Sequence, residues 1–373
     1  MRVLHVYRTY YPDPPGGLQE AIRQIALATQ MHGVENRIYC LSTAPQPKQI
    51  TREEGLVCRT RSWMAPASCD IGFLDSFRLF KTQTDWADLV HYHFPWPFAD
   101  VLHLTQQHTK PSVMTYHSDV VGKGLLGKLY KPLQHKMLTS MDAVVATSPA
   151  YIKSSPSLNS GLDPDRLRVI PLGIGETTYR EYFSAAESID LSSRYSLMPD
   201  EYFLFIGVLR PYKGLEYLLE AAKSTKLPVV IAGDGYLWDQ ITQQASNNKN
   251  IHLLGQVSHS EKIALIKGCR ALVLPSHLRS EAFGMVLVEA AMCGKPLISC
   301  EIGTGTTFVN KRDVTGLVVN PRMPDELATA MNTLSDDQEL SAHMGEAARA
   351  RYEQKFSGEA LGNAYFQLYK EFV

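Results

Sequence analysis

Short apolar runs alternate along the chain with segments whose apolar residues recur at helical spacing. Runs such as residues 2–7 and 203–209 have the length and the aliphatic composition of buried strands. Residues 18–32 instead place apolar side chains on one face of a predicted amphipathic helix. Regular alternation of strand and helix indicates parallel sheets that are covered by helices on both faces.

The same alternation occurs in both halves of the chain. In the first half, the predicted strands are residues 2–7, 36–42, 87–93, 111–117, 143–148 and 167–173. In the second half, they are residues 203–209, 228–235, 250–257, 271–277, 296–301 and 315–320. Two such series predict an α/β protein of two doubly wound, Rossmann-like domains. Ligands of these sheets bind beyond the carboxyl ends of the strands, so two facing domains would form one site in a central cleft.

The length of 373 residues also favours two domains, because it exceeds what one ordinary core accommodates. We expect one domain over residues 1–175 and the other over residues 200–355. Residues 176–199 between them are polar and show no convincing periodicity, so we expect a linker there.

Composition restricts the class of protein. The net charge of −1 gives no reason to expect nucleic acid as a partner, because neutralising phosphates requires a basic excess. The six cysteines form neither a C-x-x-C pair nor a zinc-binding spacing, which indicates reduced thiols. No run approaches the ~20 apolar residues that span a bilayer, and residues 1–13 are too polar for a signal peptide. We therefore expect a cytoplasmic protein.

Several short motifs admit both a ligand-binding and a structural interpretation. Gly16 and Gly17 lie between the first predicted strand and helix, where backbone amides can bind an anion, although a plain turn explains them equally well. The absence of G-x-G-x-x-G disfavours a nicotinamide enzyme. His117 ends a predicted strand and could reach a ligand, although a buried, hydrogen-bonded histidine is the commoner case.

Two apparent metal motifs are weak. His91 and His93 face the same side of a predicted strand, but no carboxylate or third histidine has a persuasive spacing. Asp163 and Asp165 have the D-x-D form of metal-dependent glycosyl transfer enzymes, yet they flank Pro164 in a segment typical of a turn. We expect neither motif to bind a metal.

Two cations follow the predicted strand at residues 203–209. Arg210 and Lys213 could bind phosphate oxygens, the first as a planar fork and the second as a point charge. A solvated loop is the alternative. Two cations at the carboxyl end of a strand favour anion binding.

Residues 280–296 (SEAFGMVLVEAAMCGKP) predict a helix that ends at Gly294. Its free amides would be those of Gly284, Met285 and Val286. Glu281 precedes that helix start, and Glu289 lies about one turn inside it among apolar residues. A diphosphate at the helix start would leave one carboxylate on each side, placed to accept hydrogen bonds from sugar or ribose hydroxyls. Two exposed glutamates remain the alternative.

Together these motifs resemble the signature of glycosyltransferase family four, whose members are retaining enzymes with the GT-B fold. The glutamates have the E-x7-E spacing, with Phe283-Gly284 between them. The resemblance extends to PGG at residues 15–17, TYHSD at 115–119, VIPLGIG at 169–175, YKG at 212–214, GTGTTFVN at 303–310 and TGLVVNP at 315–321. Residues 91–100 and 300–310 look most like bacterial mannosyl- and rhamnosyltransferases that build lipopolysaccharide O-antigen from GDP-sugars.

The resemblance implies a role for each position. His117 would contact the donor sugar near the reacting carbon, Glu281 its hydroxyls and Glu289 the ribose. The donor would also contact Gly16, Gly17, Phe283, Gly284, Met285 and Val286. Arg210 and Lys213 would neutralise charge on the leaving nucleotide.

The resemblance also implies a division of labour and a mechanism. The N-terminal domain would bind the acceptor and the C-terminal domain the nucleotide-sugar, and residues 356–373 would form a helix that returns to the N-terminal domain. Retaining members react on one face, so that neither a protein nucleophile nor a metal is required. One position departs from the family pattern G-R-L-x-x-x-K-G, because Val208 occupies the place of the arginine. If the strand continued, Arg210 would lie on the same face as position 208, and its side chain could take the role of the family's arginine.

A basic segment lies between residues 120 and 137. It contains no acidic residue, and its lysines are Lys123, Lys128, Lys131 and Lys136. Leucines at partial helical spacing accompany them, although Pro132 interrupts the pattern. Such a segment can lie on an anionic membrane, with each lysine contributing about 1 kcal/mol. A solvated surface helix is the alternative.

We therefore predict a metal-independent, retaining transferase that moves mannose or rhamnose from a GDP-sugar to a lipid-linked oligosaccharide, with a peripheral contact on the inner face of the cytoplasmic membrane as a further hypothesis. GDP is preferred over UDP only through the resemblance. The alternatives are a UDP-sugar transferase of the same fold, a nucleotide-sugar epimerase, a nicotinamide dehydrogenase and a non-catalytic sugar-binding protein.

Overall fold

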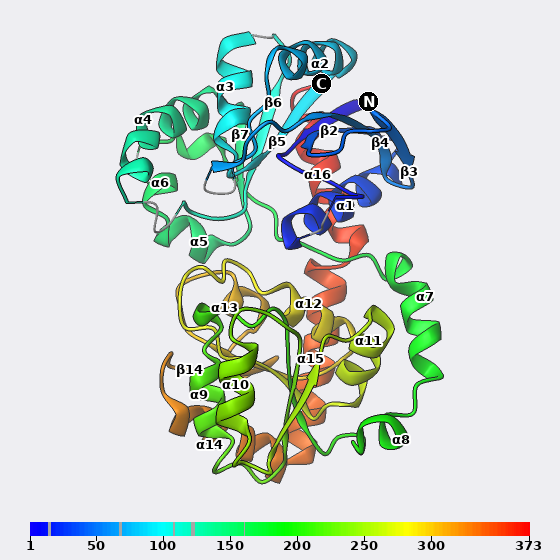
Figure 1. The fold of residues 1–373 in the computed structure, drawn as a ribbon, viewed down its shortest axis with the longest axis vertical. Coiled ribbons are helices and arrows are strands. Elements are labelled where there is room, and N and C mark those ends of the chain that lie inside the picture. The colour runs from blue at the N-terminus through cyan, green and yellow to red at the C-terminus, as the bar shows by residue number, and fades with distance from the viewer. Residues whose placement is uncertain (14–15, 67–68, 107–108, 121–123, 160) are drawn as a thin grey trace. The chain divides into compact units, whose positions relative to one another are not determined.

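The structure is a computed structural model that describes residues 1–13, 16–66, 69–106, 109–120, 124–159 and 161–373. The chain forms two compact units, each built of one sheet and the helices that pack on it (Figure 1). The first unit comprises residues 1–173 and 358–373, and the second comprises residues 174–357.

The sheet of the first unit has the strand order β3-β4-β2-β1-β5-β6-β7-β8. Its strands are β1 (Arg2–Val6), β2 (Glu35–Ser42), β3 (Gln49–Arg52), β4 (Gly55–Arg61), β5 (Leu89–Phe94), β6 (Ser112–Tyr116), β7 (Ala143–Ala146) and β8 (Leu167–Val169). Only β3 is antiparallel to its neighbour. The central strand β5 is buried at every position, so His91 and His93 lie inside the protein.

The helices of the first unit include one that is remote in sequence. They are α1 (Gly17–Gln30), α2 (Leu74–Trp86), α3 (Pro97–Gln106), α4 (Gly124–Ser140), α5 (Pro149–Ser154), α6 (Pro156–Asn159) and α16 (Gly358–Lys370). Helix α16 packs beside α1 (Figure 1). Its Leu361, Tyr365 and Tyr369 are buried in one core cluster with Val3 and Leu89.

The second unit has a fully parallel sheet in the order β11-β10-β9-β12-β13-β14. Its strands are β9 (Phe203–Ile206), β10 (Val229–Ala232), β11 (Ile251–Gly255), β12 (Ala271–Leu274), β13 (Leu297–Cys300) and β14 (Gly316–Val319). Its helices are α7 (Glu176–Glu187), α8 (Leu191–Tyr195), α9 (Leu215–Ala221), α10 (Trp238–Ala245), α11 (His259–Gly268), α12 (Met285–Met292), α13 (Thr306–Val309), α14 (Pro324–Asp336) and α15 (Gln338–Lys355).

The predicted fold class is confirmed, since every strand expected from the apolar runs is present. The expectation of an irregular linker at residues 176–199 was wrong, because this segment forms α7 and α8 within the second unit. Helix α7 buries only Tyr179 and Ala186, so its apolar stripe is too narrow to stand out in the sequence. The pair β3 and β4 was also missed, because the edge strand β3 is mostly polar.

Candidate active site

The start of α12 is shaped by the residue before it. Gly284 caps the helix with φ 84°, a left-handed conformation that favours glycine. As at any helix start, the first amides have no acceptor one turn earlier, and here they belong to half-buried Met285 and Val286. The Phe283 side chain is buried edge-to-face against Phe356, with ring centroids 6.1 Å apart. Its ring therefore packs within the unit, and its backbone is the part nearest the helix start.

Glu281 is buried, with 9% of its surface exposed, and its charge is compensated by Lys213. The ammonium of Lys213 donates to Oε2, and Ser276 Oγ donates to the same oxygen over 3.0 Å. Neither bond uses Oε1. A carboxylate has about four lone-pair positions, so Oε1 can accept a further donor.

Backbone contacts hold Lys213 and Glu281 in place. Gly214, which follows the lysine, has φ 70°, and a Cβ there would lie 2.1 Å from the carbonyl oxygen of Pro275. The loop after β9 is therefore pressed against the loop after β12. On the other side, Thr304 Oγ1 donates to the Glu281 carbonyl over 2.7 Å. Three loops at the carboxyl ends of parallel strands thus fix one ion pair.

Glu289 is also buried, with 7% exposed, and has its own lysine. Its Oε1 accepts from Lys262 Nζ over 2.5 Å and from the Tyr179 hydroxyl over 2.8 Å. The two glutamates thus share one arrangement, in which internal donors occupy one oxygen and leave the other available. Among the described residues, neither Oε1 of Glu281 nor Oε2 of Glu289 has a partner. The alternative of two exposed glutamates was wrong.

Arg210 differs from Lys213. It is exposed, its backbone is extended (φ −122°, ψ 153°), and its guanidinium makes no hydrogen bond or ion pair to the described part of the chain. Val208 is exposed as well, whereas Leu209 between them is buried. Val208 and Arg210 therefore lie on the same side of the extended segment.

In the first unit, His117 follows β6 and is almost fully buried. Its Nε2 lies 3.0 Å from Nδ1 of His93, and burial lowers the pKa of His117 to about 3. The imidazole is therefore neutral at physiological pH. Gly16 and Gly17 are exposed at the start of α1, and neither has a positive φ. A Cβ at Gly17 would meet nothing within 4 Å, so the fold of this unit does not require glycine there.

The predicted membrane-contact residues lie on α4. Lys128, Lys131 and Lys136 are exposed there, and Leu129 is 70% exposed. Lys123 lies outside the described residues.

Four polar residues at the site were missed by the sequence analysis. They are Ser276 and Thr304 around Glu281, and Tyr179 and Lys262 around Glu289. Ser276 follows the strand β12, a position that could have suggested a role. Tyr179 and Lys262 give no such signal, because they lie 110 and 27 residues from their partner. The third histidine near His91 and His93 was also missed: His5 on β1 lies opposite His91.

Two family models match the chain. Residues 15–176 match the model described as Glycosyltransferase Family 4, and residues 193–351 match Glycosyl transferases group 1. The chain is 39% identical to the O-antigen chain mannosyltransferase C of Escherichia coli, covering 99% of this chain and 98% of that protein. It is 42% identical to the D-rhamnosyltransferase WbpZ of Pseudomonas aeruginosa, covering 96% and 92% respectively.

Solved structures share the fold at much lower identity. Sucrose-phosphate synthase from Thermosynechococcus elongatus superposes with a TM-score of 0.78 at 21% identity, covering 99% of this chain and 98% of that one. Anabaena Alr3699/HepE in complex with UDP also gives a TM-score of 0.78, at 18% identity and with full coverage of both chains. These likenesses show a shared architecture of two Rossmann-like units.

Proposed function

Because the chain belongs to glycosyltransferase family four and has the GT-B fold, we propose that it transfers mannose or rhamnose from a GDP-sugar to a lipid-linked oligosaccharide, with retention of configuration. The proposal rests chiefly on the Lys213–Glu281 pair beside the start of α12. The cation and the first-turn amides suit a diphosphate, and the open carboxylate oxygen suits a hydroxyl. The full-length likeness to a mannosyltransferase and a rhamnosyltransferase supports the choice of sugar.

In this proposal the two glutamates bind the two hydroxyl-bearing ends of the donor. Oε1 of Glu281 accepts from the sugar and Oε2 of Glu289 from the ribose, while each other oxygen keeps its internal lysine. The lysines hold both carboxylates ionised and oriented without the substrate. This arrangement is useful because a prearranged acceptor needs little reorganisation when the donor binds.

Lys213 and Arg210 stabilise the negative charge that develops on the leaving nucleotide diphosphate. Arg210 is exposed and extended, so it can turn toward the phosphates at little cost in lost contacts. The departing phosphate oxygen assists the acceptor hydroxyl on the same face of the sugar. Neither a protein nucleophile nor a metal enters this sequence of steps, so EDTA should leave the rate of transfer unchanged.

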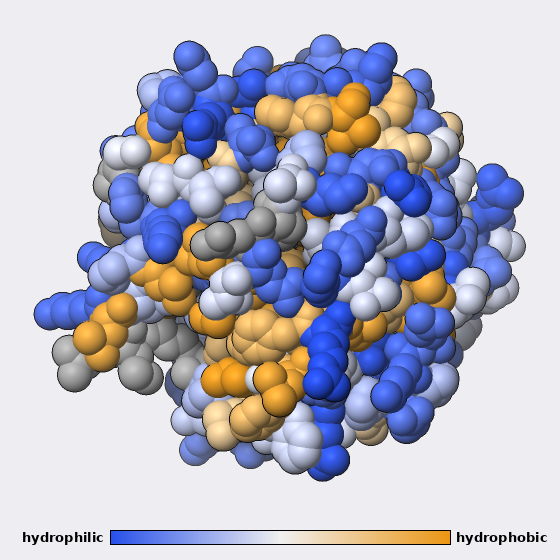
Figure 2. Space-filling view, turned by 90° about the horizontal axis from the view of Figure 1, so that it is seen from above, coloured by the Kyte–Doolittle hydropathy of each residue, from blue (hydrophilic) through white to orange (hydrophobic). Residues whose placement is uncertain are grey.

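We place the acceptor's lipid at an anionic membrane surface, as a peripheral contact through α4. Among the described residues, we find no helix with both the length and the apolar character needed to span a bilayer. Figure 2 shows one face of the molecule, on which hydrophobic side chains gather in patches among hydrophilic ones. Exposed Leu129 lies among Lys128, Lys131 and Lys136, as expected for a helix that lies on lipid head groups.

Binding to vesicles tests this contact. Changing Lys128, Lys131 and Lys136 together to glutamate should reduce binding to phosphatidylglycerol vesicles by at least a hundredfold, since each lysine contributes about 1 kcal/mol. A matched control changes three exposed lysines of the second unit: Lys223, Lys226 and Lys249. Equal binding of the two triple variants would remove α4 as the contact.

The donor is tested first by calorimetric titration with GDP, UDP and ADP, without and with Mg²⁺. Binding of GDP alone would support the proposed donor, and transfer from GDP-mannose and GDP-rhamnose would then be measured. A preference for UDP would favour the second candidate, a UDP-sugar transferase, for which the UDP complex of Alr3699/HepE is the supporting observation. Conversion of the donor without any acceptor would instead indicate an epimerase.

A further inference from the structure

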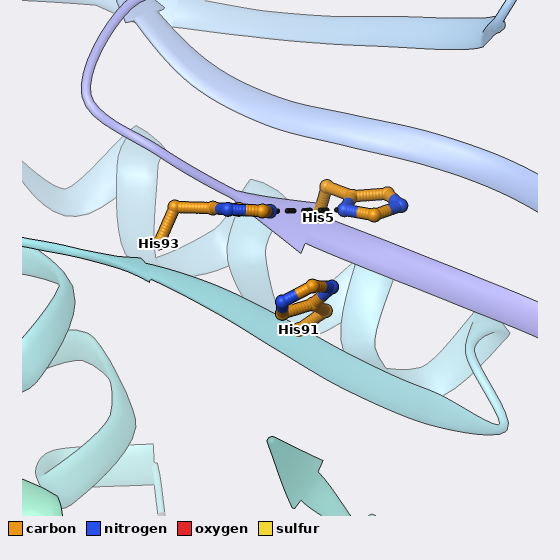
Figure 3. Close-up of side chains that lie close together, drawn as sticks. All are labelled: His5, His91 and His93. Atoms are coloured by element: carbon orange, nitrogen blue, oxygen red, sulfur yellow. Dashed lines mark hydrogen bonds between the residues drawn. The ribbon is translucent and has the colours of Figure 1, made fainter. Parts of the chain in front are cut away.

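A chain of hydrogen bonds crosses the sheet of the first unit and ends at His117. Asn36 Oδ1 lies 3.2 Å from His5 Nε2, and His5 Nδ1 lies 3.0 Å from His93 Nε2 (Figure 3). His93 Nδ1 then lies 3.0 Å from His117 Nε2. The first three side chains are at most 2% exposed, and His117 stands at the carboxyl end of β6, where ligands of such sheets bind.

The Asn36 end of this hydrogen-bond network determines which atom donates in each bond. Asn36 Nδ2 lies 2.9 Å from the backbone carbonyl oxygen of Ala26, which can only accept a hydrogen bond. The amide nitrogen must therefore face Ala26, and the amide oxygen must face His5. Since that oxygen is an acceptor too, His5 Nε2 carries the hydrogen.

The donor and acceptor nitrogens of each following ring are then determined in turn. Burial lowers the pKa of His5 to about 4 and holds the pKa of His93 well below its ordinary value, so both rings are neutral. A neutral imidazole has one N–H and one bare nitrogen. His5 Nδ1 is therefore bare and accepts from His93 Nε2–H. In turn, His93 Nδ1 is bare and accepts from His117 Nε2–H.

We propose that Asn36, His5 and His93 are positioning residues that fix His117 as its Nε2–H tautomer and present its bare Nδ1 as an acceptor for a hydroxyl of the donor sugar. The identity of that ligand rests on the proposed function, whereas the tautomer does not. A neutral acceptor selects for a hydroxyl at this position. It disfavours a phosphate oxygen, which cannot donate to Nδ1.

The same chain argues against His117 as a proton acceptor in the reaction. A proton accepted at Nδ1 could pass onward through the protein only if every N–H of the network shifted one step toward Asn36. There it would meet an amide oxygen whose partner nitrogen is already committed to Ala26. The chain therefore orients a lone pair and offers no route for a proton.

A metal ion is the competing explanation for this cluster. Ligand atoms of His5, His91 and His93 lie within 4.8 Å of one another. However, each of their six ring nitrogens already has a hydrogen-bond partner, since His91 bonds to Thr115 Oγ1 and the Tyr369 hydroxyl. A metal would have to displace these bonds, so the network accounts for the cluster better.

The tautomers can be measured directly in the full-length protein. Labelling histidine with ¹⁵N and recording long-range ¹H–¹⁵N spectra at pH 7 should show Nε2–H, with a bare Nδ1, for His5, His93 and His117. An Nδ1–H tautomer or an imidazolium at His117 would overturn the proposal. The proposal would also be overturned if protein purified without chelator contained stoichiometric zinc and the ¹⁵N shifts of His5 and His93 showed metal coordination. This measurement needs neither a variant nor a substrate.

Binding provides the second arm. His93→Leu should give His117 mixed tautomers and weaken binding of GDP-mannose about three- to tenfold, the loss of one hydrogen bond, while GDP alone binds as before. His91→Leu is the control. His91 is an equally buried ring on the same strand, but it does not belong to the hydrogen-bond network from Asn36 to His117. Equal losses for GDP and GDP-mannose in His93→Leu would indicate a merely structural role and overturn the proposal. If wild-type protein binds no GDP-mannose, the proposed donor fails and the tautomer result still stands.

Discussion

At the predicted ligand positions, the first unit presents a neutral group and the second presents charged ones. His117 is held by Asn36, His5 and His93, all uncharged and directional. Glu281 and Glu289 are instead each held by a half-buried lysine, Lys213 and Lys262 respectively. Both arrangements fix the orientation of a buried polar side chain. The two sheets have similar architecture, but they do this with different chemical groups.

The difference concerns what each arrangement can tolerate. A buried ion pair loses most when one partner is removed, because an uncompensated charge remains in a poorly solvated place. In a network of neutral imidazoles, a substitution removes one hydrogen bond at a time. Adding a proton to any ring, however, removes the bare nitrogen that its neighbour's N–H needs as an acceptor. We therefore expect the second unit to be sensitive to charge-removing substitutions and the first unit to be sensitive to acid.

The largest effect is expected for Lys213→Met. It leaves Glu281 buried without its cation, which should lower the free energy of unfolding by about 3–5 kcal/mol. It also removes a cation from the leaving group, so kcat should fall by roughly a hundredfold or more. Urea unfolding and a transfer assay measure the two effects. Lys226→Met is the control, because the Lys226–Asp336 pair is more than half exposed and should contribute less than about 1 kcal/mol; equal effects of the two changes would contradict the prediction.

The Lys262–Glu289 pair allows a cleaner separation of charge from packing. Lys262→Met alone should lower the free energy of unfolding by about 3 kcal/mol, since Glu289 would keep only the Tyr179 hydroxyl as partner. Adding Glu289→Gln should recover most of that loss. A double-mutant cycle in urea measures the coupling. Additive losses would show that the pair is not what stabilises Glu289.

Acid should affect the two units in sequence. The pKa of His5 is lowered to about 4 and that of His117 to about 3, against about 6.5 in the unfolded chain. The unfolded chain binds these protons first, so stability is full above about pH 6.5 and falls as the pH drops. At pH 5 each ring costs on the order of 2 kcal/mol. Burial also raises the pKa of Asp100, so this one carboxyl makes the folded state more stable as the pH drops. Its effect is opposite to that of four buried histidines, whose pKa values burial lowers: His5, His91, His93 and His117.

In the second unit, the Tyr195 hydroxyl and the Ser258 backbone amide lower the pKa of Glu261 to about 2. Its contribution to stability is therefore present above about pH 4.5 and is lost between there and pH 2. Urea unfolding at pH 7 and pH 5, followed in each unit by pulsed hydrogen exchange, should show that the first unit weakens earlier. Earlier loss of the second unit would contradict the comparison.

The smallest effect is expected at Arg210. Because the Arg210 guanidinium has no partner among the described residues, Arg210→Ala should leave the melting temperature unchanged and weaken GDP binding about tenfold at low salt. Introducing Val208→Arg in that variant should restore affinity, since both positions lie on one side of the segment. Calorimetry measures both steps, with Arg180→Ala as an exposed control. A fall in melting temperature, or no recovery by Val208→Arg, would contradict this interpretation.

Much of the fold could be predicted because inner strands of both sheets, such as β6 and β7 in the first unit and β9, β10 and β12 in the second, are short apolar runs buried on two faces. Segments with little apolar surface were not predicted, as β3 and α7 show. The start of α12 could also be predicted, since its glycine and glutamates lie within one local motif.

The partners of the site residues could not be predicted. Glu281 and Lys213 are 68 residues apart, and His5 and His93 are 88 apart. Such pairs meet through the order and register of parallel strands, which periodicity within a single strand does not specify. His5 lies opposite His91 only because β1 pairs with β5 in that register.

Helix α16 bears on the order in which the chain can fold during translation. The second unit is one continuous segment, residues 174–357, and can close its core once that segment has left the ribosome. The first unit cannot, because Tyr365 and Tyr369 of α16 complete its core and bond to Thr115 and His91. The N-terminal residues should therefore wait, incompletely packed, until residue 369 emerges, and the second unit should mature first on the nascent chain.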